Sequence, residues 1–265
     1  MSVDEHTIDL AGSPVFFRSA PARGVPAVYL HGVPTSSEDW LPFLAAAGGL
    51  APDLIGFGRS GKGGHLDYTI GGLADAVEAL LPERLNLVGH DWGAVVGLEL
   101  AARHPDRVAA LALLNPLPLV EGFEWPAPAR RWRRPLLGEL AMGATTQWLL
   151  DRELRRASPA WPPERTAAVW RQFDQGTQRA ILRLHRQTDK RALEATRPRL
   201  GRLSAPALVL WGELDPWCPV ALAAAFSALL PRATVERVDG AGHWPWIERP
   251  EVIDRALAFL ADARA

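Results

Sequence analysis

The sequence predicts an α/β fold in which a mostly parallel sheet is covered by helices on both faces. Two observations support this class. Short apolar runs alternate with helical patterns along residues 1–116 and 199–265, and such alternation is typical of parallel strands joined by helices. Residues 117–198 interrupt this rhythm with helical spacing alone, which indicates a helical insertion after one strand.

The overall composition fits one large globular domain with an insertion. The chain has 265 residues, of which 48% are hydrophobic and 22% charged, as in an ordinary globular enzyme. A formal net charge of −1 gives no electrostatic reason to expect nucleic acid or membrane partners. Cys218 is the only cysteine, so no intrachain disulfide forms, and we expect a small buried hydrophobe there. The amino-terminal segment shows no signal pattern, so a cytoplasmic location is expected.

The first element is an antiparallel hairpin at the sheet edge, predicted from alternating apolar residues around Gly12-Ser13-Pro14. The runs that predict buried parallel strands are 28–30, 85–88, 108–114, 208–211 and 234–238. Between them, Leu73, Val77 and Leu80 share one helix face. Residues 94–102 predict a small-residue helix, and residues 250–260 predict a last amphipathic helix.

The insertion differs in composition from the rest of the chain. Residues 121–200 hold 16 Arg and Lys against 9 Asp and Glu. We interpret this excess as a solvated helical surface, with a preference for acidic substrates as the alternative. We therefore divide the chain into a core domain, 1–116 and 199–265, and a helical cap domain, 117–198. Five of the eleven tryptophans fall in the cap: Trp125, Trp132, Trp148, Trp161 and Trp170.

The strongest chemical signal is Gly89-His90-Asp91-Trp92-Gly93, which lies between an apolar run and a helix. A strand–turn–helix of this kind presents a nucleophile on a sharp turn, and the turn needs small residues two positions before and after it. Both positions are glycine here, and Asp91 stands at the centre. The alternative is that Asp91 only caps the helix.

The partners of Asp91 follow in order. Asp215 lies in the loop after strand 208–211, and His243 lies in the glycine-rich loop after strand 234–238. Loops that follow parallel strands meet at the carboxyl edge of the sheet, so we expect all three side chains to converge. Glu213 is the alternative for the acid.

With these residues in place, the chain resembles the α/β-hydrolase superfamily along nearly its whole length. Within it, the chain is similar to the aspartate-nucleophile branch: haloalkane dehalogenases, epoxide hydrolases and fluoroacetate dehalogenases. Besides the turn at Asp91, the shared motifs are residues 31–37, residues 52–60, and Gly242-His243 with Glu248-x-Pro250. The resemblance implies the α/β-hydrolase fold, with eight strands, and an oxyanion hole made by the backbone N–H groups of Val33 and Trp92. We expect neither a metal nor an organic cofactor.

An aspartate changes the reaction that such a site favours. Asp91, with a reference pKa near ~3.9, is anionic at neutral pH without losing a proton to a base. Attack on an acyl carbon would form a high-energy anhydride, whereas attack on an sp³ carbon that bears a leaving group forms an ester. His243, held by Asp215, then activates water to hydrolyse that ester.

The residues that bear on the leaving group conflict. Trp92 can donate its indole N–H to a halide, as in dehalogenases. Many dehalogenases place a halide-binding asparagine where Val33 stands, so a second donor would come from a cap tryptophan that the sequence does not single out. Epoxide hydrolases use two cap tyrosines, yet Tyr29 and Tyr68, the only tyrosines, both precede the cap.

His185 occupies a place that resembles the second of those tyrosines. It could donate a proton or bind the leaving group, but we favour a surface histidine on an Arg-rich helix. Ala94, Val95 and Val96 follow the nucleophile turn, where fluoroacetate dehalogenases have carboxylate-binding arginines, so that substrate is disfavoured.

We therefore predict a haloalkane dehalogenase-like hydrolase that acts with water on a small neutral organic substrate. The alternatives are an epoxide hydrolase that forms a diol and a non-catalytic ligand-binding homologue. The ordered set of Asp91, Asp215 and His243 argues against the second alternative. The sequence leaves the physiological substrate and the oligomeric state open.

Overall fold

The computed structural model describes residues 2–10 and 12–263 and contains one eight-stranded sheet. The strand order is β1-β2-β4-β3-β5-β6-β7-β8, antiparallel in the first two pairings and parallel in the others. The predicted edge hairpin and the mostly parallel eight-stranded sheet are confirmed. The strands are β1 Asp4–Leu10, β2 Ser13–Ala20, β3 Ala27–Leu30, β4 Gly49–Pro52, β5 Leu85–Asp91, β6 Val108–Pro116, β7 Ala207–Gly212 and β8 Ala233–Val238.

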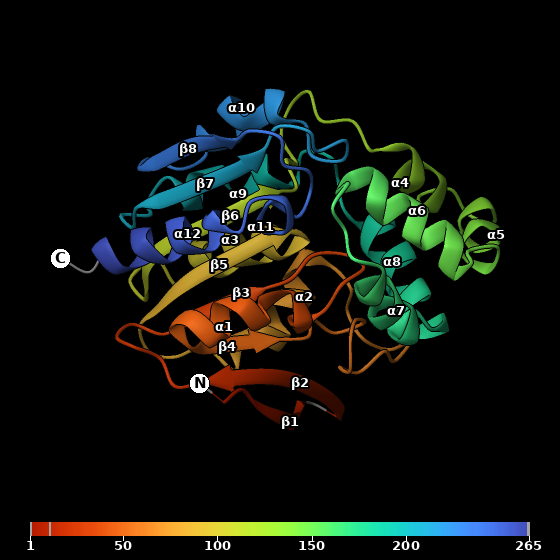
Figure 1. Ribbon diagram of the computed structural model, residues 1–265, viewed down its shortest axis with the longest axis horizontal. Coiled ribbons are helices and arrows are strands. Elements are labelled where there is room, and N and C mark those ends of the chain that lie inside the picture. The colour runs from red at the N-terminus through yellow and green to blue at the C-terminus, as the bar shows by residue number, and fades with distance from the viewer. Residues whose placement is uncertain (1, 11, 264–265) are drawn as a thin grey trace.

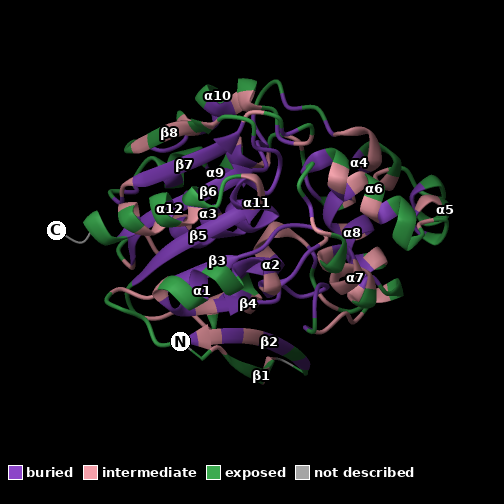
Figure 2. Cartoon of the chain, in the orientation of Figure 1, coloured by how far each residue is buried: buried purple, intermediate pink, exposed green. Residues whose placement is uncertain are grey.

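Helices cover both faces of the sheet (Figure 1). Every residue of β5, β6 and β7 is buried, because alternate side chains of these strands enter two separate apolar clusters. Figure 2 shows the central strands as the continuous buried layer. One face packs against α1 (Leu41–Ala47) and α12 (Glu251–Asp262). The other face packs against α2 (Ile70–Glu78), α3 (Trp92–Arg103) and α10 (Ala223–Ser227).

The chain between β6 and β7 forms the helices α4 to α9, which are called the insertion below. In Figure 1, α4 to α8 gather beside the sheet as a separate layer. Side-chain caps begin two of these helices, because Thr146 accepts a hydrogen bond from Leu149 N–H and Asp174 accepts one from Thr177 N–H. The helices are α4 Ala127–Trp132, α5 Leu137–Gly143, α6 Gln147–Ala157, α7 Pro163–Gln172, α8 Gln175–Gln187 and α9 Ala192–Leu200.

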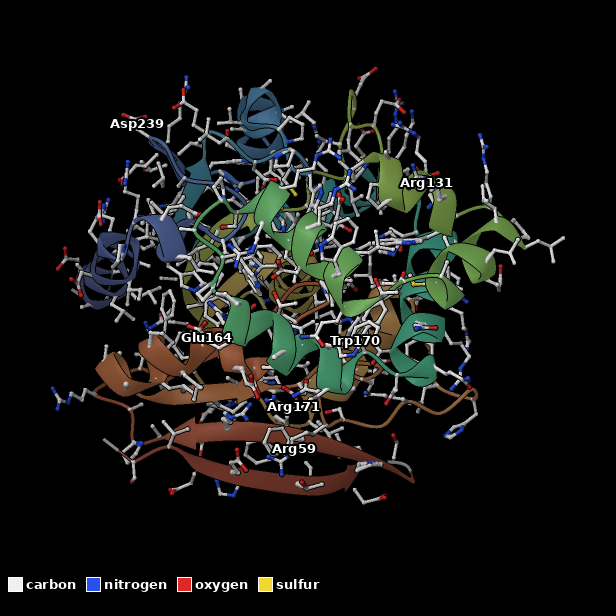
Figure 3. All side chains as sticks on the ribbon, turned by 45° about the vertical axis from the view of Figure 1, so that its right-hand side comes forward. Arg59, Arg131, Glu164, Trp170, Arg171 and Asp239 are labelled. Carbon is white, nitrogen blue, oxygen red and sulfur yellow. The ribbon has the colours of Figure 1, made fainter. Side chains whose placement is uncertain are left out.

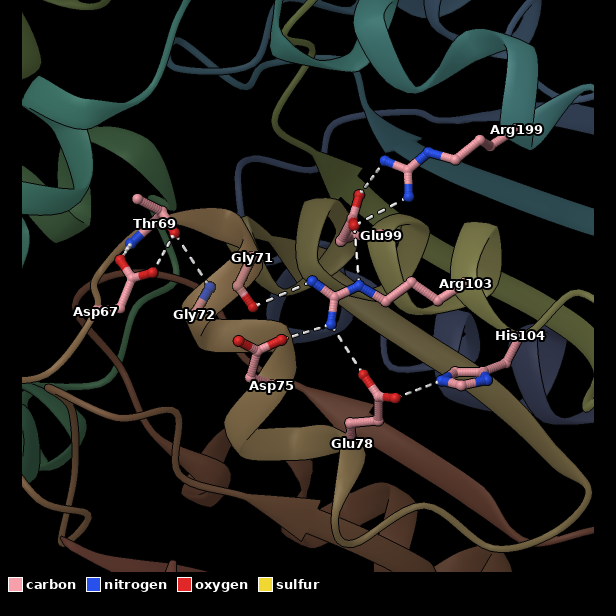
Figure 4. A network of polar contacts seen from close by, with 10 residues as sticks. All are labelled: Asp67, Thr69, Gly71, Gly72, Asp75, Glu78, Glu99, Arg103, His104 and Arg199. Atoms are coloured by element: carbon pink, nitrogen blue, oxygen red, sulfur yellow. Dashed lines mark hydrogen bonds and ion pairs between the residues drawn. The ribbon is translucent and has the colours of Figure 1, made fainter. Parts of the chain in front are cut away.

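A polar network ties α9, the last of these helices, to the core (Figure 4). Arg103 of α3 contacts Asp75 and Glu78 of α2 at 2.6 and 2.8 Å. Glu99 of α3 contacts Arg103 at 3.0 Å and Arg199 of α9 at 2.8 Å. The network therefore joins three helices where the chain returns from the insertion to β7. No helix within the described residues is long and apolar enough to cross a membrane.

Candidate active site

Asp91 lies at the sharp turn between β5 and α3, with φ +50° and ψ −120°. A Cβ at Gly89 would lie 2.5 Å from Ala94 Cα, and a Cβ at Gly93 would lie 2.0 Å from the carbonyl oxygen of Leu30. Both glycines are thus required sterically, as the sequence pattern predicts. The Asp91 side chain makes no capping bond to α3, so the alternative of a simple helix cap is wrong.

The carboxylate of Asp91 is buried and faces backbone donors. Val33 N–H donates to Asp91 Oδ2 at 3.1 Å. Burial raises the pKa of Asp91 to about 6, while the charge of His243 and the N–H groups of Val33 and Trp92 act to lower it. Asp91 is therefore ionised at pH 7, although its pKa lies above the reference value. The N–H groups of the predicted oxyanion residues, Val33 and Trp92, both lie at this carboxylate.

Asp215 and His243 form a buried pair. His243 Nδ1 lies 2.7 Å from Asp215 Oδ2. Asp215 Oδ1 accepts the backbone N–H groups of Trp217 and Cys218 at 2.8 and 3.0 Å, so donors surround the carboxylate. Glu213 instead forms a surface ion pair with Arg237, so the alternative acid is wrong.

The second ring nitrogen of His243 has no partner. Its Nε2 is buried and makes no hydrogen bond to any described residue, while Nδ1–H points to Asp215. Burial alone lowers the pKa of His243, but Asp215 and then Asp91 outweigh it, and the net pKa is raised above its ordinary value. Nε2 is therefore the free basic atom of this site.

Asn115 is a site residue that the sequence patterns described above do not single out. It is the next-to-last residue of β6, with φ +38°, and its Nδ2 donates to Asp215 Oδ2 at 2.7 Å and to the Gly242 carbonyl oxygen at 3.2 Å. Its Oδ1 accepts the Gly212 N–H at 2.9 Å. The signal was a polar residue directly after a buried apolar run, as at Asp91. Asn115 therefore fixes Asp215 relative to residues 239–244, the loop that carries His243 and is called the histidine loop below.

The loop that carries His243 is also held by the insertion. His243 N–H donates to the carbonyl oxygen of Ala157, at the end of α6, at 2.8 Å. Glu248, in α11 (Pro245–Glu248), accepts the Ser158 hydroxyl and the Ala160 N–H. These bonds give a physical reason for the Glu248-x-Pro250 motif. They also make the insertion part of the framework that places the histidine.

A cavity of about 370 Å³ lies between the core and the insertion, with Asp91 in its wall. Its lining is mostly apolar, and the core contributes Val33, Trp92 and Trp217. Arg131, labelled in Figure 3, also belongs to the lining but is itself exposed. The lining from α6 and α8 includes Leu150, Glu153, Leu154, Ile181 and His185.

His185 is not a surface residue, and that interpretation is wrong. His185 is only 3% exposed, because it lies on the inward face of α8, one turn after Ile181. Its ring centroid lies 5.0 Å from those of Trp92 and Trp132 and 5.5 Å from that of Trp125. His185 therefore lies beside Trp92 at the cavity wall.

The protonation state of His185 limits what it can do. A carbonyl oxygen can only accept, so Nδ1, which lies 2.8 Å from Ile181 O, carries the ring proton. Burial, opposed by this bond and helped by the Arg133 charge, lowers the pKa of His185 to about 4. At pH 7 the ring is neutral, and Nε2 has a lone pair and no proton. Tyr29 and Tyr68 donate to backbone carbonyls outside the cavity.

The fold and this site define an α/β hydrolase. The sequence profile of the α/β hydrolase fold family matches residues 26–250, and the chain belongs to that family. A haloalkane dehalogenase from Mycobacterium marinum is 34% identical over 238 residues, which cover 80% of this chain and 77% of the relative.

Two solved structures extend the comparison. The haloalkane dehalogenase DbeA from Bradyrhizobium elkani superposes with a TM-score of 0.83 at 26% identity and covers 99% of both chains. The epoxide hydrolase CorEH superposes with a TM-score of 0.81 over 98% of this chain and 99% of its own, and at 23% identity this shows the fold alone. The chain is a hydrolase of this fold, similar to haloalkane dehalogenases along most of its length.

Proposed function

We propose that the protein hydrolyses the carbon–halogen bond of a small neutral organic halide through an ester on Asp91, with His243 as the base and Asp215 as its partner. The observation that carries the proposal is the buried Asp91 carboxylate, held by Val33 N–H, in the wall of an apolar cavity. The second support is the unpartnered Nε2 of His243. A protein that only binds ligands has no need of this free base, which argues against the non-catalytic alternative.

The reaction has two halves. An Asp91 oxygen attacks the carbon that bears the halogen, the carbon–halogen bond breaks, and halide leaves with the bonding pair. His243 Nε2 then takes a proton from water while the water oxygen attacks Asp91 Cγ. The N–H groups of Val33 and Trp92 stabilise the resulting oxyanion. The bond between Cγ and the ester oxygen then breaks, and protonated His243 gives its proton to the departing alkoxide, which leaves as the alcohol. The new carboxyl group of Asp91 loses its remaining proton to solvent, which restores the carboxylate.

Trp92 and Trp125 are the proposed donors for the departing halide. Both line the cavity, their rings stack at 6.0 Å, and neither indole N–H has a hydrogen-bond partner in the described part of the chain. Arg133 lies 4.9 Å over the Trp125 ring and places a positive charge nearby. Trp125 is thus the proposed second donor that the sequence left open, and residues 117–198 are the proposed cap that closes the site from water.

The epoxide alternative has weaker support. Opening an epoxide requires a proton donor for the oxygen, and the usual tyrosine pair does not line this cavity. His185 lies in a suitable place, but its neutral ring offers a lone pair and not a proton at pH 7. These features favour a halide, which leaves without being protonated.

The experiment that tests this proposal compares two substrates of similar size. We expect the enzyme to release bromide and 1-butanol from 1-bromobutane and to form little diol from 1,2-epoxybutane, with the Asp91→Asn variant as the blank. Faster diol formation than bromide release would replace the halide proposal with the epoxide alternative. Activity on neither class, across chlorinated, brominated and iodinated chains, would reject both.

The two halves should respond differently to pH. Protonation of Asp91 blocks attack, so kcat/KM is expected to fall as the pH drops through about 6, the pKa of Asp91.

The ester removes the Asp91 charge that helps to raise the pKa of His243, so His243 should lose its proton more readily in the ester than in the free enzyme. Under conditions in which hydrolysis limits kcat, the acid limb of kcat should then lie below the His243 pKa of the free enzyme measured by NMR. An acid limb at or above that pKa would contradict the assignment.

A further inference from the structure

Asp39 is a buried carboxylate to which the proposed reaction gives no part. It lies in the short 3-10 helix Ser37–Trp40 and is 2% exposed. This helix directly follows residues 31–36, the loop that carries Val33 and is called the oxyanion loop here. The Thr35 hydroxyl lies 2.6 Å from Asp39 Oδ2 and 3.1 Å from the Gly32 carbonyl oxygen. The indole N–H of Trp244 donates to the same Oδ2 at 3.3 Å. Arg165 of α7 forms an ion pair with Asp39 Oδ1.

These contacts join the insertion to two loops at once. Thr35 belongs to the loop whose Val33 N–H faces Asp91. Trp244 follows His243 directly, and their rings meet at 4.6 Å. Asp39 thus receives one donor from the oxyanion loop, one from the histidine loop and a cation from the insertion.

The same helix end packs on the histidine loop by ring contacts. The Arg165 guanidinium lies 4.8 Å over the Trp161 ring, and Trp161 contacts Trp244 at 4.5 Å. A carboxylate as deeply buried as Asp39 is costly without its cation. Loss of Arg165 is therefore expected to shift Asp39 and the groups bound to it, rather than to leave them in place.

We propose that the Asp39–Arg165 ion pair is a positioning device that docks α7 on the oxyanion and histidine loops and so sets the rate of ester hydrolysis. The inference rests on the proposed function. Both halves use Asp91 and the Val33 N–H bound to it, but only hydrolysis also needs His243 Nε2 aligned with a water and with the ester at Asp91. Displacements of about 1 Å can cost on the order of 10²-fold in such a step, so the second half is the sensitive one.

The chain offers a matched control for this pair. Lys62 Nζ contacts Asp174 Oδ2 at 2.9 Å and also donates to the Gln172 carbonyl oxygen. This second ion pair likewise joins the core to the insertion, near the end of α7 that carries Trp170 and Arg171 in Figure 3. It contacts neither the oxyanion loop nor the histidine loop. Lys62→Met therefore removes a core–insertion ion pair without touching the loops.

The test measures the two halves separately. Arg165→Met and Lys62→Met are mixed with 1-bromobutane, quenched with acid during turnover and weighed intact. The pre-steady-state burst of bromide gives the rate of the first half, and the steady-state rate gives ester hydrolysis when that step limits turnover. For Arg165→Met we expect ester hydrolysis to slow by about tenfold or more, with ester accumulation and the first half changed by less than about threefold. Arg165→Lys should recover most of the hydrolysis rate. Lys62→Met should stay within about twofold of the unmodified enzyme in both halves.

The opposing results are equally definite. Equal changes in Arg165→Met and Lys62→Met, or a lowered melting temperature with no accumulation of ester, would reduce the pair to a structural contact and overturn the inference. If Arg165→Met does not fold, Asp39→Asn/Arg165→Met removes both charges, and ester hydrolysis at the unmodified rate in that variant would overturn it too. His243→Phe distinguishes failure of this inference from failure of the proposed function. Absence of an ester in that variant would contradict the proposed function itself.

Discussion

Asp91→Asn is expected to lower turnover of 1-bromobutane by roughly 10⁴-fold or more, because no other group can form the ester. The amide has a similar shape and can still accept from Val33 N–H, but it is a poor nucleophile. Bromide release by freshly purified variant, with intact mass used to monitor deamidation back to Asp, measures the effect. Turnover near that of the unmodified enzyme in a sample free of deamidation would show that the nucleophile is misassigned.

The same variant should not be less stable at pH 7. Burial raises the pKa of Asp91 from 3.8 to about 6, so its ionised form destabilises the fold, and the difference corresponds to roughly 3 kcal/mol. This penalty is fully present above the folded-state pKa and disappears as the pH falls below the unfolded value. Asp91→Asn should therefore gain stability at pH 7, and the gain should vanish near pH 3.5. Chemical denaturation at the two pH values measures it, and a large loss at pH 7 would contradict the burial of a charge there.

His243→Phe is expected to stop catalysis after one event. Asp91 can still attack, so one equivalent of bromide should be released, and the ester should then persist because no base activates water. Intact mass should increase by one butyl group, and peptide mapping should place it on Asp91. Stability should fall by about 1–3 kcal/mol because Asp215 loses a buried donor, and the Asn115 bond to the same oxygen limits the loss.

A control for this variant separates the base from the bulk of the ring. His243→Gln is smaller and polar and should also retain the ester, so both variants should accumulate it if Nε2 is the base. Continuous bromide release by either variant, at a rate near that of the unmodified enzyme, would contradict the role of His243. Absence of any adduct would contradict the covalent mechanism.

The sequence predicted most of the central sheet and the ordered set of three side chains, for identifiable reasons. Apolar runs such as 85–88 are buried on both faces, and Asp91, Asp215 and His243 each follow such a run. β4 was not recognised, because Gly49–Pro52 is a four-residue run without β-branched or aromatic residues. It is nevertheless a strand because β2 and β3 pair with it on either side.

The remaining parts of the site depend on how the insertion docks. Helical spacing alone did not reveal that His185 turns towards Trp92, because the Arg-rich neighbours of His185 indicated an exposed face. The Asp39–Arg165 pair and the bond from His243 N–H to Ala157 O join segments that lie far apart in the sequence. Local patterns carry no information on such pairs, since each partner read alone is an ordinary polar or small residue.

The most direct measurement of the central claim is the source of the oxygen in the alcohol. A single turnover of 1-bromobutane by excess enzyme in water enriched in oxygen-18 should give 1-butanol without label, because its oxygen comes from the Asp91 carboxylate. The label should instead appear in the peptide that contains Asp91. Labelled butanol in that first turnover would mean that water attacks the carbon directly, and the covalent mechanism proposed for Asp91 would be wrong.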